Sequence, residues 1–72
     1  RDFERRLVLA AVYEPSFGEF CFKNLQPDYF QSPPCFVIFK HAQSLFRRGE
    51  RVTFGSVVQE ILDDVSIDEA RS

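Results

Sequence analysis

The chain has 72 residues, of which 44% are hydrophobic and 15% aromatic, and its formal net charge is −2 at pH 7. This length suffices for one core and is close to the lower limit for independent stability. The charge does not by itself indicate a nucleic-acid partner, and no apolar run approaches membrane-spanning length. We interpret the chain, which begins with Arg1, as a piece of a longer protein that forms one helical domain over residues 1–72.

Two helices are predicted in the first third of the chain. Within the helix predicted from Phe3 to Tyr13, the run from Leu7 to Val12 is apolar on nearly every side, which indicates a helix that is central to the bundle or packs against two neighbours. Pro15 should end it, because the residue before a proline disfavours the α conformation. Ser16 is expected to cap a shorter helix that ends at Asn24. The spacing along this second helix predicts an apolar face made of Phe17, Phe20, Cys21 and Leu25.

A turn that contains two aromatic residues precedes the third helix. Gln26-Pro27-Asp28 has the composition of a turn, and Tyr29-Phe30 is expected to pack beneath it. Ser32 as a cap and Pro33-Pro34 in the first turn predict the start of a helix that Gly49 ends. Its apolar stripe consists of Cys35, Ile38, Phe39, Ala42, Leu45 and Phe46.

Two further helix starts follow Gly49. Thr53 is expected to cap a fourth helix, whose apolar stripe consists of Phe54, Val57, Val58, Ile61, Leu62 and Val65. Ser66 and Glu69 have the spacing of a capping box, which predicts a fifth helix. We therefore expect an all-α fold, a small bundle of four to five helices around one Phe-rich core. The most buried residues should include Phe3, Leu7, Phe20, Phe30, Phe39, Ala42, Phe46, Val58, Ile61 and Leu62.

Residues that could support catalysis or metal binding are scarce. His41 is the only histidine, and with Cys21 and Cys35 it provides neither four ligands nor the paired spacing of a zinc site. We expect it on the polar side of the third helix. Both cysteines lie in apolar runs, so buried free thiols in a cytoplasmic protein are expected. The sequence therefore predicts no catalytic residue, no metal and no cofactor.

Charge is distributed unevenly along the chain. Residues 36–51 are mainly basic and residues 60–71 mainly acidic, which favours oriented docking onto a charged protein. Solvated helix faces are the alternative explanation for both segments. The basic cluster contains only three arginines, and the aromatic residues fall on core stripes, so we expect no direct binding to nucleic acid.

A candidate partner-binding face lies beside the apolar stripe of the third helix. It consists of Phe36, Lys40, Gln43 and Arg47, at i, i+4, i+7 and i+11. A Phe at the edge of a core, flanked by cations, has the composition of an interface anchor with a charged rim. The alternative is that Phe36 only covers the Pro33-Pro34 turn.

The order of these elements resembles a small helical domain found in two bacterial replication proteins. One is the C-terminal helicase-interaction domain of DNA primase, and the other is the N-terminal domain of the replicative hexameric helicase. The resemblance covers nearly all of the chain and is carried by short motifs, which here are Pro27-Asp28-Tyr29-Phe30, Ser32-Pro33, Ile38-Phe39 and Gly49-Glu50-Arg51-Val52-Thr53.

Some short motifs of the chain resemble the primase domain, and others resemble the helicase domain. Tyr13-Glu14-Pro15-Ser16-Phe17 and the acidic segment 63–71 resemble primases, whereas Ala10-Ala11 and Thr53-Phe54 are closer to the helicase domain. We favour the primase, which implies a non-catalytic, monomeric module that tethers this RNA-primer-making nucleotidyltransferase to the replicative DNA helicase. The first alternative is the N-terminal, primase-interacting domain of the helicase itself. The second is an unrelated helical adaptor.

Overall fold

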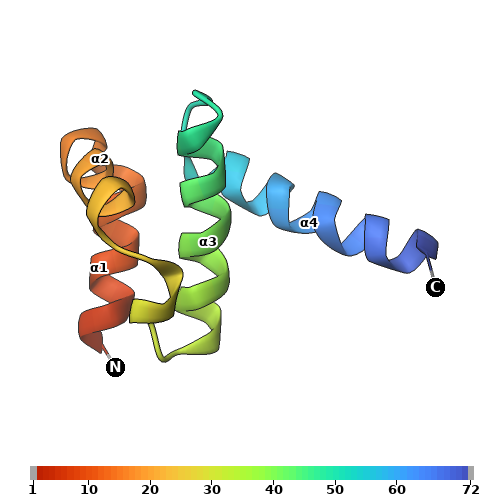
Figure 1. The fold of residues 1–72 in the computed structure, drawn as a ribbon, viewed down its shortest axis with the longest axis horizontal. Coiled ribbons are helices and arrows are strands. Elements are labelled where there is room, and N and C mark those ends of the chain that lie inside the picture. Colours follow the sequence, from red (N-terminus) through yellow and green to blue (C-terminus); the bar gives the residue numbers. More distant parts are fainter. Residues whose placement is uncertain (1, 72) are drawn as a thin grey trace.

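A computed structural model describes the backbone of residues 2–71 and the side chains of residues 3–65. This backbone contains no strand, so the predicted all-α fold is confirmed. Its elements are α1 (Asp2–Tyr13), α2 (Pro15–Asn24), a 3₁₀ turn η1 (Pro27–Tyr29), α3 (Pro33–Arg47) and α4 (Phe54–Arg71). In Figure 1, α1 and α3 stand side by side with α2 packed at one end, while α4 projects away from α3.

The junction between α1 and α2 is a single extended residue, Glu14. Pro15 occupies the first position of α2, where a missing N–H leaves no helical bond unmade and the fixed φ of proline suits the helix. The predicted cap at Ser16 is therefore wrong, because α2 begins one residue before it. The predicted end of α1 before Pro15 is confirmed.

Gly18 determines which face of α2 is buried. A Cβ atom at this position would collide with the carbonyl oxygen of Ala11, so α2 crosses α1 at a distance that only glycine permits. This crossing turns Cys21 and Phe22 into the core and leaves Phe20 62% exposed. The predicted burial of Phe20 is wrong, because the contact line of α2 runs through Gly18 and not through Phe17.

Four phenylalanines form the centre of the core. Phe39 is 1% exposed, and its ring centroid lies 5.3 Å from that of Phe22 and 4.9 Å from that of Phe30. Phe46 packs 5.3 Å from Phe22. Tilted aromatic pairs at these distances add to the stabilisation from buried area. Burial is confirmed for Phe30, Phe39 and Ala42, whereas Leu7, Phe46 and Ile61 are half-buried and pack against the edge of the core cluster.

Three further core predictions are wrong, namely those for Phe3, Val58 and Leu62, which are all exposed. The inward side of α1 consists of Val8, Ala11 and Val12, and Phe3 does not share it. On α4, Val57 is buried and Ile61 half-buried. Val58 follows Val57 and Leu62 follows Ile61. Because each step along an α-helix turns by about 100°, Val58 and Leu62 point away from α3.

Both cysteines are buried and free, as predicted. Burial raises the pKa of the Cys21 thiol. A thiol in this state packs as a small apolar side chain and is a poor nucleophile.

The start of α3 is held by a residue distant in sequence. Ser32 precedes the helix as predicted, but its hydroxyl makes no capping hydrogen bond. Instead the Glu4 carboxylate of α1 accepts hydrogen bonds from the backbone N–H groups of Ser32 (3.0 Å) and Gln31 (3.1 Å). These bonds lower the pKa of Glu4, because they favour the ionised carboxylate.

The turn from α3 to α4 follows its predicted chemistry. Gly49 has a φ of 77°, and the N–H of Glu50 reaches back to the carbonyl of Leu45 at 3.0 Å, which closes α3. Thr53 Oγ1 then accepts a hydrogen bond from the Ser56 N–H at 3.0 Å, so the predicted cap of α4 is confirmed. The predicted break at Ser66 is absent from the α4 backbone, and the side chains of its proposed capping box lie outside the described residues.

Candidate protein-docking surface

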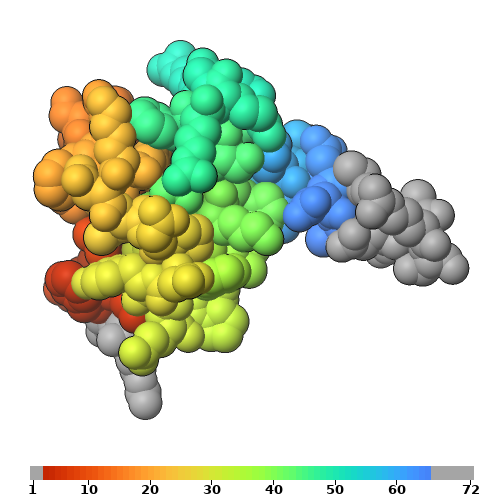
Figure 2. Space-filling view, in the orientation of Figure 1, coloured from red at the N-terminus to blue at the C-terminus, as the bar shows by residue number. Residues whose placement is uncertain are grey.

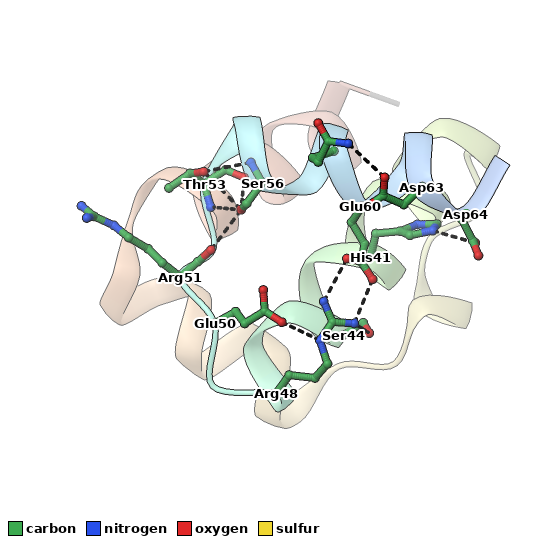
Figure 3. A network of polar contacts seen from close by, with 11 residues as sticks. His41, Ser44, Arg48, Glu50, Arg51, Thr53, Ser56, Glu60, Asp63 and Asp64 are labelled. Carbon is green, nitrogen blue, oxygen red and sulfur yellow. Dashed lines mark hydrogen bonds and ion pairs between the residues drawn. The ribbon is translucent and has the colours of Figure 1, made fainter. Parts of the chain in front are cut away.

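The oppositely charged segments of the chain partly neutralise each other across the α3–α4 junction. The Arg48 guanidinium donates two hydrogen bonds of 2.9 Å to the Glu60 carboxylate, and its Nε donates to Glu50 at 2.8 Å (Figure 3). These bonds raise the pKa of Arg48 and lower that of Glu60. Part of the charge asymmetry seen in the sequence therefore serves to attach α4.

His41 forms a second polar link between the same two helices. Its Nδ1 lies 2.8 Å from the Val37 carbonyl oxygen. Its Nε2 lies 3.1 Å from Asp64 Oδ2 (Figure 3). The side chain is therefore buried against α4, and its predicted place on the polar side of α3 is wrong. No group of three or more metal-binding side chains occurs within the part of the chain whose side chains are described.

A hollow of about 390 Å³ lies along α3, beside the turn that leads into η1. In Figure 2 this turn lies against α3 on the face in view. Three of the four predicted partner-binding residues line the hollow, namely Lys40, Gln43 and Arg47. Phe36 does not line it; this residue is half-buried against the core. The remaining lining residues are Gln26, Pro27, Ser44 and Arg48.

Gln43 forms a fixed wall of the hollow. It is only 4% exposed, and its amide nitrogen donates to the carbonyl oxygens of Phe22 (2.9 Å) and Leu25 (3.0 Å). A buried amide that satisfies two carbonyl groups stabilises the structure around it, since an unpaired carbonyl there would cost about 1–3 kcal/mol. Gln43 thus positions the end of α2 relative to α3. Nothing in its sequence context signals this role.

Lys40 and Arg47 are the accessible cations of the hollow. Both side chains are exposed, and neither forms an ion pair with a carboxylate among residues 3–65. Their positions in the sequence differ by seven, which places them about 10.5 Å apart along one side of α3. Arg48, the third cation there, is already bound to Glu50 and Glu60. The hollow therefore presents two unneutralised positive charges on a rigid helix.

Comparison with known proteins identifies the family. The family model described as "DnaB-like helicase N terminal domain" matches residues 1–72. No curated protein and no solved structure gave a match. Within the described residues, no helix is long and apolar enough to cross a membrane.

The match distinguishes between the two families suggested by the sequence. It supports the helicase alternative better than the primase interpretation, which has no support beyond the local motifs. Because the family model spans the full length of the sequence, the chain belongs to the DnaB-like helicase N terminal domain family.

Proposed function

We propose that this domain is the protein-docking N-terminal domain of a replicative hexameric DNA helicase, and that its partner is the primase that makes RNA primers at the replication fork. The observation that carries this proposal is the family match over residues 1–72. The choice of primase as the partner rests on the resemblance of the sequence to the primase-interacting domain of the helicase, which is here taken as the parent protein.

The surface of the domain is compatible with such a role. A docking domain needs accessible charged groups on a scaffold that does not reorganise, because ordering a mobile surface reduces the net binding free energy. Lys40 and Arg47 are exposed on α3, and α3 is anchored through Phe39 and Gln43. Charged groups of this kind accelerate association and select partners more than they add affinity.

A binding and competition experiment tests the proposal. The 72-residue chain, labelled with a fluorophore, is titrated with the primase of the same organism, and a basic protein of similar size serves as the control titrant. We expect saturable binding to the primase alone. Unlabelled chain should also reduce the stimulation of primer synthesis that the full-length helicase produces, since both compete for one site. Binding that fails to saturate up to about 1 mM, the weak end of specific association, would contradict the proposal.

A further inference from the structure

We infer that the hollow formed by α3 and the Gln26-Pro27 turn binds an acidic α-helix of the partner protein, with carboxylates two turns apart paired to Lys40 and Arg47. The identity of the partner rests on the proposed function. The chemistry of the ligand rests on this surface alone.

The first support is the charge of the lining. Three of its seven residues are cationic and none is a carboxylate. Arg48 binds both Glu50 and Glu60, whose two carboxylates outnumber its single positive charge, so the positive charge available to a ligand comes from Lys40 and Arg47. These two exposed cations have no carboxylate partner among residues 3–65, and they attract carboxylates and repel basic segments.

The second support is the spacing of the two cations. They lie about 10.5 Å apart along α3, and a partner helix presents residues i and i+7 on one face at the same separation. An extended strand repeats its same-face side chains at about 6.7 Å intervals, and neither one nor two such intervals matches this distance. A helix lying along α3 is therefore the better fit.

The third support is that one wall of the hollow is fixed by hydrogen bonds. Gln43 donates to the carbonyl oxygens of Phe22 and Leu25, which attaches the end of α2, next to the Gln26-Pro27 turn, to α3. Ser44 lies between the cations and contacts Arg48 Nη1 at 3.4 Å. Only the Lys40 and Arg47 side chains must be ordered on binding. Arg47 can engage a carboxylate with two parallel bonds, and Lys40 acts as a point charge.

The inference is tested by charge reversal with a matched control. Lys40→Glu/Arg47→Glu changes the net charge by the same amount as Arg5→Glu/Arg6→Glu, which alters two exposed cations on α1. We expect the first variant to bind the primase about tenfold or more weakly, with a slower association rate and less dependence on salt. The α1 variant should stay within about threefold of the parent chain. Equal losses in the two variants would overturn the inference, because they would show only a general charge effect.

A peptide probe separates this inference from the proposed function. Two alanine-rich helical peptides are compared, one with Glu pairs at i and i+7 and one with the same residues at i and i+5, on different faces. The first should shift the NMR signals of Lys40 and Arg47 and lose this effect in the Lys40→Glu/Arg47→Glu variant. Shifts without preference for either peptide, or centred on Arg5 and Arg6, would contradict the inference even if the primase binds. If the peptide result holds and the primase does not bind, only the proposed function fails.

Discussion

The two halves of the molecule are held together by different kinds of interaction. Helices α1, α2 and α3 meet around an aromatic cluster, with Phe39 at its centre and a glycine-mediated crossing at Gly18. Among its described side chains, helix α4 contributes the fully buried Val57 and the half-buried Ile61 to the core, and it is also attached by the polar contacts of Arg48 and His41. Its first residue, Phe54, stacks on Tyr13 at 6.3 Å, and both rings remain exposed.

This difference predicts how each half responds to its surroundings. Apolar burial is not screened by salt, and close packing tolerates few changes of volume. Exposed ion pairs are screened by salt and contribute little singly. We therefore expect the separation of α4 from α3 to require less free energy than the unfolding of the α1–α3 core. High salt should make this separation easier.

The largest effect is expected from Phe39→Ala. Truncation of a buried phenylalanine costs about 3–5 kcal/mol, which is most of the stability that a domain of this size possesses. Urea unfolding monitored by circular dichroism measures the loss. Phe20→Ala, on the exposed side of α2, is the control and should change stability by less than about 0.5 kcal/mol. Similar losses in the two variants would refute the assignment of the core.

Gly18→Ala should have the next largest effect. The added Cβ meets a backbone carbonyl of α1, which can move only if the two helices separate, and overpacking of this kind costs about 1–3 kcal/mol. Gly55→Ala is the matched control, because its Cβ would have only Thr53 Oγ1 nearby, at 3.9 Å. It should leave stability unchanged or raise it by up to about 1 kcal/mol through better helix propensity. A Gly18→Ala variant that melts with the parent would disprove the close crossing.

Arg48→Ala should loosen α4 and leave the core intact. It removes the bonds to Glu60 and Glu50, so the amides of α4 should exchange faster while those of α1–α3 keep their protection. Hydrogen exchange followed by NMR provides the measurement, and high salt should reduce the difference from the parent. Arg47→Ala, the neighbouring exposed arginine, is the control. Uniformly faster exchange in all four helices would show that α4 and the core unfold as one unit.

The smallest effect concerns Glu4, and it depends on pH. Its pKa is lowered from 4.5 by the N–H groups of Ser32 and Gln31, so the folded state favours the ionised form. This stabilisation is present above pH 4.5 and is lost as the pH falls through the lowered value in the folded chain. Glu4→Gln should therefore melt below the parent at neutral pH, and the difference should vanish once the pH is below the lowered pKa, where Glu4 is protonated in both states. A constant difference in melting temperature across this range would contradict the role of the carboxylate.

The sequence predicted most of the residues of the candidate surface, but not which of them are buried or paired. The i, i+4, i+7, i+11 spacing placed Lys40, Gln43 and Arg47 on one side of α3, and all three line the hollow. The pattern could not show that Gln43 is buried, because its two acceptors belong to residues 18 and 21 positions earlier in the chain. Nor could it show that Arg48 is paired with Glu60, since that pair forms only where α4 packs against α3.

The sequence by itself determined the elements whose causes are local. Pro15 ends α1, Gly49 with its positive φ ends α3, Thr53 caps α4, and the stripe of α3 follows helical periodicity. Each depends on backbone dihedrals or hydrogen bonds within a few residues. Only the tertiary structure decided which apolar side chains are buried, because burial requires a neighbour. Phe20 and Leu62 lie on apolar stripes as regular as that of Phe39 and remain exposed, since no helix in the described structure covers those sides of α2 and α4.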